Sequence, residues 1–279
     1  MPNGLQHQAL SLKGSPGKLS NRRAVAHFDR LADAYDRGQY RTGRRTFITS
    51  RHEHIIQMLS AIALSDTASS VLEAGCGPGN LLPHLASRFS RVCALDASSK
   101  MLDIARTRTA DFRNVTYQVG NIEALPFGDE SFDLVCSAGV IEYLPNIERA
   151  LQELQRVLRP GGLLILSTTN ANAPANWLLP AMDLLVRIPF VARMVGMQRT
   201  TYRLWHHRIP EFKQRLRTAG LLLESERHFY LTLPRPLNRL FPTVTRNAER
   251  WFDGYMHTSL RHLAEGYIAV ATKSPGSRE

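Results

Sequence analysis

Short apolar runs alternate with helical patterns through the middle of the chain. The runs are five to eight residues long, and between them lie segments whose apolar positions recur three or four residues apart. They lie at 71–75, 91–96, 115–120, 132–139 and 162–168. Strands that alternate with helices form a parallel sheet with helices on both faces. The pattern therefore predicts an α/β fold with a doubly wound sheet.

Two helical patterns precede this core. Residues 21–60 place apolar side chains such as Ala24, Phe28 and Ile55 at helical spacing, and we expect them to form a helical cap. Residues 1–20 are polar and contain Gly, Ser and Pro, so we expect a disordered N-terminus. The cap would then precede a domain that spans residues 61–279.

The alternation is interrupted after the fifth apolar run. Two insertions, at 170–208 and 234–264, are predicted to form helical lids, and a helical pattern lies between them at 210–220. Further apolar runs at 221–233 and 266–273 predict two more strands. The expected architecture is a Rossmann-like domain with a seven-stranded sheet.

A glycine-rich turn follows the first predicted strand. Gly75, Gly77 and Gly79 lie in VLEAGCGPGN, where a strand ends and a helix begins. Glycines permit positive φ and close approach of a ligand, and the free N–H groups of a helix start face that ligand. Asp96 ends the second strand, where its carboxylate can accept hydrogen bonds from ribose hydroxyls. These features predict a nucleoside site, and Asn80 in place of the third glycine of GxGxxG argues against a dinucleotide.

Four motifs in order carry a resemblance to a known family. They are VLEAGCGPGN, ALDASSKML, GNIEALPFGDESFDLVCSAGVIEYL and LQRVLRPGGLLILST, and they resemble those of class I S-adenosylmethionine-dependent methyltransferases. Within that family the chain is similar to the ubiquinone and menaquinone biosynthesis group (methyltransferase type 11), which has a helix like AHFDRLADAYD before its core. The resemblance covers residues 24–169. It implies a methyltransferase with S-adenosyl-L-methionine as cofactor and S-adenosyl-L-homocysteine as product.

The resemblance also implies the residues of the cofactor site. The glycine-rich turn would line the methionine and ribose part, and Asp96 would hold the ribose hydroxyls. The full set is Tyr35, Glu73, Gly75, Cys76, Gly77, Gly79, Asp96, Ala97, Ser98, Met101, Asn121, Ile122, Ser137 and Ala138. The chain departs from the family pattern at Asn121, where an Asp is usual, and at Tyr143, where many members have a His.

The chemistry of methyl transfer asks mainly for positioning. Displacement at a sulfonium methyl is in line, so orientation supplies most of the acceleration, and a general base is needed only if the acceptor must lose a proton. The candidates to face the acceptor are His206, His207, Tyr143 and Tyr40, with packing or solvated positions as the alternative. No metal is expected, because the two histidines of RHEH at 51–54 lie at i and i+2, on different helix faces.

Charge is distributed unevenly along the chain. The net charge is +11, with +7 on residues 1–52, −5 on 53–186 and +9 on 187–262. Residues 176–208 mix arginines with apolar side chains, a pattern that suits an apolar acceptor pocket, peripheral membrane contact or a homo-oligomer contact. We therefore expect a hydrophobic, anionic small-molecule acceptor of prenyl, quinone, polyketide or lipid type. The alternatives are an RNA methyltransferase, although no nucleic-acid-binding module is recognisable, and a non-catalytic cofactor-binding protein.

Composition excludes several other classes. With 43% hydrophobic and 21% charged residues, the chain is neither a disordered tail nor a collagen or coiled coil. The three cysteines show no paired spacing, so neither a disulfide framework nor a zinc site is predicted. The first twenty residues lack the apolar core of a signal peptide, and no apolar run reaches the ~20 residues of a membrane span. We expect a cytoplasmic protein.

Overall fold

A computed structural model shows how the chain folds. It describes residues 16–40, 46–62, 69–177, 204–231, 243–244, 251–252, 254–255 and 258–274. Most of the two predicted insertions, including 178–203, lies outside the described residues, and the predicted domain boundaries stay predictions.

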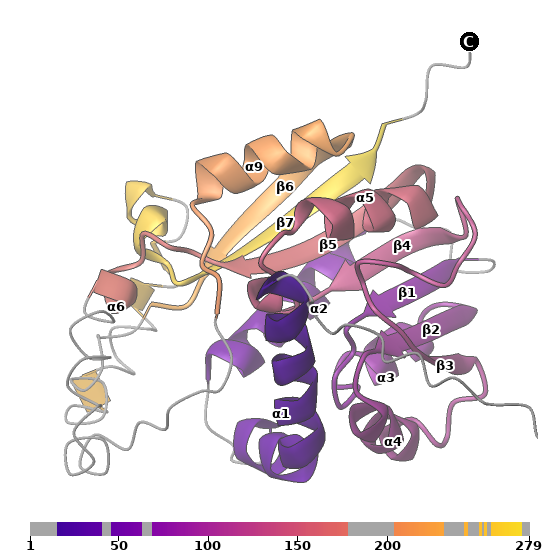
Figure 1. Ribbon diagram of the computed structural model, residues 1–279. Helices are drawn as coiled ribbons and strands as arrows, with labels where there is room; N and C mark the ends of the chain where they lie inside the picture. The colour runs from indigo at the N-terminus through magenta and orange to yellow at the C-terminus, as the bar shows by residue number, and fades with distance from the viewer. Residues whose placement is uncertain are drawn as a thin grey trace, which may run out of the picture.

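A seven-stranded sheet forms the centre of the molecule (Figure 1). Its strands are β1 (Ser70–Ala74), β2 (Arg91–Asp96), β3 (Val115–Val119), β4 (Phe132–Ser137), β5 (Leu158–Thr169), β6 (Leu221–Phe229) and β7 (Gly266–Lys273). The order is β3-β2-β1-β4-β5-β7-β6, and β7 runs antiparallel to the other six described strands. The expected doubly wound, Rossmann-like α/β fold is confirmed. The strand order reverses between β1 and β4, which is where open sheets of this kind bind ligands.

Helices cover both faces of the sheet. They are α1 (Pro16–Tyr40), α2 (Phe47–Ala61), α3 (Leu82–Ala86), α4 (Ser99–Arg108), α5 (Glu148–Val157), α6 (Pro174–Trp177) and α9 (Ile209–Thr218), with 3-10 turns η1 (Ile141–Tyr143) and η2 (Ser259–Leu263). Apolar side chains of α5 and α9 share one core cluster with one face of the strands. Those of α2, α3 and α4 pack on the opposite face. Among the described helices, none is both long and apolar enough to cross a bilayer.

Local sequence explains several element boundaries. β1 is buried along its whole length, as a central parallel strand requires, and it ends at the glycine-rich turn. α3 begins at Leu82 with Pro83 in its first turn, where a missing N–H costs no hydrogen bond. β6 ends at Phe229, four residues before the predicted end, and the next residue, Tyr230, has a φ of 61°. A positive φ in a bulky residue interrupts the extended conformation.

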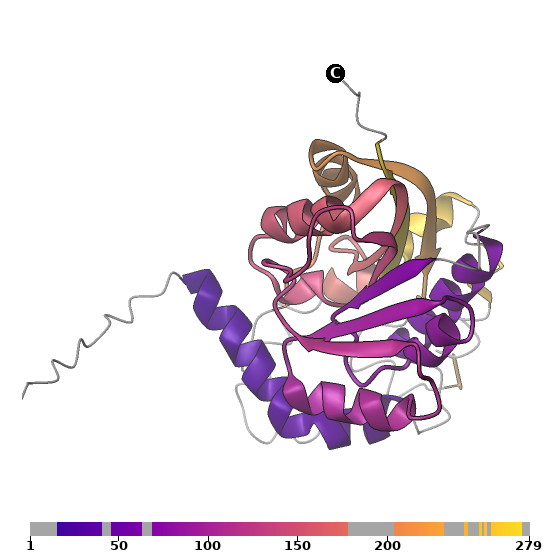
Figure 2. The ribbon, with the colours of Figure 1, turned by 90° about the vertical axis from the view of Figure 1, so that its right-hand side faces the viewer.

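The N-terminal helix begins earlier than the sequence predicts. α1 starts at Pro16, inside the stretch 1–20 that was expected to be disordered, and it runs without a break to Tyr40. Proline suits this position because its fixed φ is already helical. Figure 2 shows α1 as an indigo helix along one side of the core. It contacts α4, α2 and η1. Because α4 follows β2 and η1 follows β4, α1 lies at the carboxyl ends of the strands, near the point where the strand order reverses.

Candidate cofactor site

The glycine-rich turn is built by hydrogen bonds to the neighbouring strand. The backbone N–H groups of Gly75 and Cys76 both donate to the carbonyl of Leu95, at 2.7 and 3.0 Å. Gly75 has a φ of 78° and Gly77 one of 53°, which favours glycine at both positions. A side chain at Gly75 would overlap Val140, whereas a Cβ at Gly77 would meet nothing within 4 Å. The turn is therefore tightly held at its start and open at Gly77.

Asp96 is oriented by two backbone donors. Its Oδ2 accepts from the N–H of Gly77 at 2.8 Å, and its Oδ1 accepts from the N–H of Ser98 at 2.8 Å. Burial raises the pKa of Asp96, and these two hydrogen bonds act in the opposite direction. Each carboxylate oxygen can accept a further bond, so both remain usable for a ligand with two hydroxyls.

A cavity of about 910 Å³, including its open side, lies over the turn and the carboxyl ends of the strands. Of the fourteen predicted cofactor residues, the cavity is lined by Tyr35, Glu73, Gly75, Cys76, Gly77, Asp96, Ala97, Ser98, Met101, Asn121, Ile122 and Ala138. Gly79 and Ser137 do not line it. Gly79 instead packs close to Ala105 of α4, and Ser137 is buried in β4.

Glu73 places a carboxyl group in the cavity wall. The side chain is buried, and its Oε2 has no hydrogen-bond partner. Burial, and after it the charge of Asp96, raises the pKa of Glu73 to about 8. A buried carboxyl with a free oxygen suits a cationic ligand or a hydrogen-bond donor. The neighbouring thiol of Cys76 has a pKa well above its ordinary value because of burial, so it is not a nucleophile.

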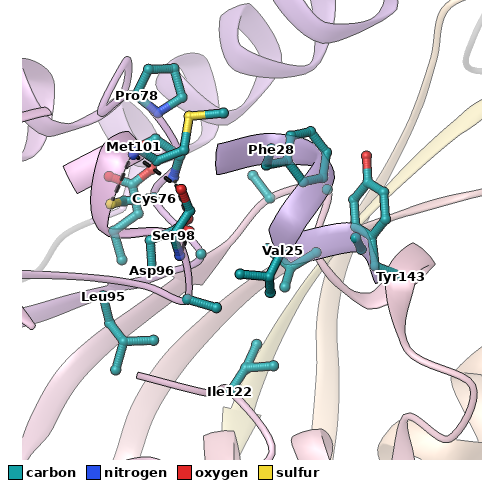
Figure 3. Close-up of a pocket in the computed structure, with 18 of the residues that line it drawn as sticks. Val25, Phe28, Cys76, Pro78, Leu95, Asp96, Ser98, Met101, Ile122 and Tyr143 are labelled. Atoms are coloured by element: carbon teal, nitrogen blue, oxygen red, sulfur yellow. Dashed lines mark hydrogen bonds between the residues drawn. The ribbon is translucent and has the colours of Figure 1, made fainter. Parts of the chain in front are cut away.

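Helix α1 closes one side of the cavity. Figure 3 shows Phe28 and Tyr143 next to each other there, with Asp96, Ser98 and Met101 on the other side. The Phe28 ring lies edge-on to Tyr143, with centroids 5.2 Å apart, and makes a similar contact with Tyr35 at 5.5 Å. The aromatic residues thus form an apolar wall opposite the polar turn.

Several lining residues were not predicted from the sequence. They are Ala24, Val25, Phe28, Arg51, His52, Pro78, Leu95, Gly120, Gly139, Val140 and Leu144. The helical spacing of Ala24 and Phe28 predicts apolar positions of a helical cap, and it is the one sequence signal that points to these two residues. The RHEH pattern at 51–54 gives no sign that Arg51 and His52 line a cavity. Burial, followed by the charges of Arg51 and Arg108, lowers the pKa of His52 to about 3, so this imidazole is neutral near pH 7.

The predicted acceptor-facing residues differ in where the structure places them relative to the cavity. Tyr143 lines the cavity. His206 and His207 are not among the lining side chains: His206 Nδ1 lies 3.0 Å from Thr169 Oγ1, and the backbone N–H of His207 donates to the Thr169 carbonyl. Burial lowers the pKa of both imidazoles. Tyr40 ends α1, and its side chain lies outside the described residues. The catalytic roles stay predictions.

Comparison with known proteins identifies the family. Residues 72–166 match the model of the methyltransferase domain. The chain is 31% identical over 179 residues to the demethylmenaquinone methyltransferase of Tropheryma whipplei (strain Twist), covering 63% of this chain and 71% of the relative. It is 42% identical over 116 residues to the malonyl-[acyl-carrier protein] O-methyltransferase of Erwinia billingiae, covering 41% of this chain and 45% of the relative. The chain thus spans about half the length of the malonyl-[acyl-carrier protein] O-methyltransferases that it matches.

Solved structures agree on the fold. The magnesium protoporphyrin IX methyltransferase of Synechocystis PCC 6803, which has bound SAH, has 15% identity and a TM-score of 0.61, covering 91% of this chain and 100% of that one. A methyltransferase of Mesorhizobium loti has 21% identity and a TM-score of 0.54, covering 77% and 96%. The fold and the site define a Rossmann-like methyltransferase domain. The chain belongs to the class I S-adenosylmethionine-dependent methyltransferases, which confirms the resemblance and the expected cofactor.

Proposed function

We propose that this protein transfers the methyl group of S-adenosylmethionine to a hydrophobic acceptor that carries an anionic group. The cavity is the observation that supports this function best. It joins an oriented carboxylate at Asp96, a backbone turn open at Gly77 and an apolar wall of Phe28 and Tyr143. A nucleoside, a sulfonium and an apolar acceptor would each find a suitable surface there.

The residues of the cavity suit the cofactor in detail. Asp96 would accept hydrogen bonds from the ribose hydroxyls, and the partnerless Oε2 of Glu73 would face a cationic part of the molecule. When bound, the cofactor supplies a methyl group on an excellent leaving group. The chain then has to hold the acceptor in line and exclude water, which the aromatic rings of α1 and η1 can do.

The acceptor is proposed from charge and from the relatives together. The relatives named above act, by their names, on malonyl-[acyl-carrier protein] and demethylmenaquinone. The basic segments 1–52 and 187–262 flank the cofactor-binding core and favour an acceptor with an anionic group. The same charge is what favours RNA as the second candidate acceptor.

A binding and transfer experiment tests the proposed function. We expect calorimetry to detect S-adenosylhomocysteine binding, and Asp96→Ala to weaken it about 10- to 100-fold, because each charge-assisted hydrogen bond lost is worth ~1.5–3 kcal/mol. Asp103→Asn is the control, because this carboxylate is exposed on α4. Radiolabel transfer to quinone, prenyl, lipid, malonyl-thioester and tRNA acceptors then identifies the acceptor. Affinity unchanged within twofold in Asp96→Ala would refute the role of Asp96, and binding of NAD instead would refute the function.

A further inference from the structure

Arg51 is a buried cation in the wall of the cavity. Its side chain belongs to α2 and is only 6% exposed. The guanidinium Nε has no hydrogen-bond partner, and no described carboxylate forms an ion pair with Arg51. Arginine stays charged in proteins, and burying a charge without a partner is costly. A buried guanidinium that faces a cavity therefore calls for an anion from the ligand.

The backbone makes room for this guanidinium at Gly139. Gly139 follows β4, has a φ of 74°, and donates its N–H to Ser167 Oγ at 2.9 Å. A Cβ at this position would overlap Nη1 of Arg51 and lie 2.5 Å from its Cζ. On α2 itself, the Phe47 ring lies 5.9 Å from the same Cζ. The guanidinium therefore lies against a backbone position that has room only for glycine, and near an aromatic ring of its own helix.

Among the described residues, the titratable groups around Arg51 form no hydrogen bond or ion pair with its guanidinium. Glu142, on η1, is buried, and its Oε2 has no hydrogen-bond partner. Burial raises the pKa of Glu142, and the charge of Arg51 opposes this shift without cancelling it. His52 is neutral near pH 7, and Glu73 is largely protonated there. Asp96 is held by Gly77 and Ser98 at the glycine-rich turn. Among the described lining residues, no ionised carboxylate is paired with this guanidinium.

We propose that Arg51 is the carboxylate-binding residue of the cavity. A planar guanidinium offers parallel N–H donors that match the two oxygens of a carboxylate. This inference rests on the proposed function. The carboxylate could be supplied by the methionine part of the cofactor or by the acceptor. Both present the same chemistry to Arg51, and binding experiments distinguish them.

The first experiment removes the amino acid group, and with it the carboxylate, from the cofactor side. S-adenosylhomocysteine carries the amino acid group, whereas 5′-methylthioadenosine lacks it and keeps the nucleoside. If the cofactor supplies the carboxylate, Arg51→Gln weakens S-adenosylhomocysteine binding about 10- to 100-fold and leaves methylthioadenosine within twofold. Arg51→Lys keeps the charge but not the parallel N–H donors, so its affinity for S-adenosylhomocysteine should lie between those of the wild-type protein and Arg51→Gln. Unchanged methylthioadenosine binding also shows that the variant is folded, and Arg106→Gln, an exposed cation on α4, is the matched control.

The second experiment tests the acceptor side with defined probes. In protein saturated with S-adenosylhomocysteine, binding of malonyl-coenzyme A is compared with that of acetyl-coenzyme A, which lacks the carboxylate. If the acceptor supplies the carboxylate, Arg51→Gln leaves S-adenosylhomocysteine affinity unchanged and abolishes the preference for the malonyl probe. If the variant changes neither S-adenosylhomocysteine affinity nor this preference by more than twofold, the proposal is wrong. Failure of the wild-type protein to bind S-adenosylhomocysteine would instead refute the proposed function, and the inference with it.

Discussion

At the scale of single residues, Glu73 combines burial with an unusual proton affinity. Its folded-state pKa of about 8 lies above the ordinary value of 4.5. Between these pH values the native carboxyl holds a proton that the unfolded chain has released, so its contribution to the free energy of unfolding falls as the pH rises. Near pH 7 the native side chain is therefore mostly protonated. A cation bound beside it would reverse this, because an opposite charge favours the ionised carboxylate.

Ligand binding should then release a proton from Glu73. We expect S-adenosylhomocysteine, whose amino group is cationic, to release close to one proton per site at pH 7, and methylthioadenosine to release almost none. Calorimetry in phosphate and in Tris, which differ in ionisation enthalpy, measures this number. In Glu73→Gln the release should disappear, because an amide has no proton to lose in this range. Equal proton release by this variant and the wild-type protein would show that another group titrates.

At the scale of elements, two side chains tie α1 to the cofactor-binding core. Ser98 Oγ donates to Asp29 Oδ1 at 2.5 Å, and Arg108 Nη2 donates to Asp36 Oδ1 at 2.6 Å. The two aspartates are seven residues apart, which places them on one face of the helix two turns apart. Arg108 also donates to the carbonyl of Pro78 in the glycine-rich turn. The position of α1 is thus coupled to the turn itself.

Breaking the second tie should loosen α1 and weaken cofactor binding. Asp36 is buried, so Asp36→Asn leaves Arg108 short of a charged partner, and we expect a cost of about 1–3 kcal/mol. Hydrogen exchange in residues 24–36 should accelerate, and S-adenosylhomocysteine affinity should fall severalfold. Asp33→Asn is the control, since Asp33 is exposed on the same helix. If both variants show the hydrogen exchange and the S-adenosylhomocysteine affinity of the wild-type protein, the position of α1 does not contribute to cofactor binding.

The same scale shows what the sequence could and could not predict. β2 and β7 begin and end where their apolar runs do, because a buried strand is specified by its own residues. The glycine-rich turn and Asp96 follow from those strands for the same reason. The burial of Arg51 and Glu142 was missed because a charged residue is ordinarily exposed. Arg51 enters the cavity wall only when α2 packs against Gly139, in the turn after β4, so tertiary contacts rather than local pattern place it there.

At the scale of the whole molecule, charge separates the core from its flanks. Residues 53–186 carry −5, and residues 187–262 carry +9. The surplus is partly offset by the core, because Arg215 Nη1 lies 3.2 Å from Glu148 Oε1, whereas the contact of Lys213 with Glu226 is already counted within the +9. A pair of this kind reduces the charge available to a polyanion more than it affects the binding of a single anionic group. It supports the proposal of a small anionic acceptor over RNA.

The salt dependence of binding should distinguish the two acceptors. A protein that neutralises several phosphates of a single strand loses affinity with a log–log slope near −0.7 per phosphate, because counterions are released. A single anionic head group gives a slope of about one or less in magnitude, and turnover should then depend more on the length of the apolar tail. We therefore expect shallow salt dependence for a prenyl, quinone or acyl acceptor, measured as KM across KCl concentrations. Tail-shortened acceptors should show a higher KM at every salt concentration. A steep slope with tRNA, together with no methyl transfer to any apolar acceptor, would instead identify RNA as the substrate.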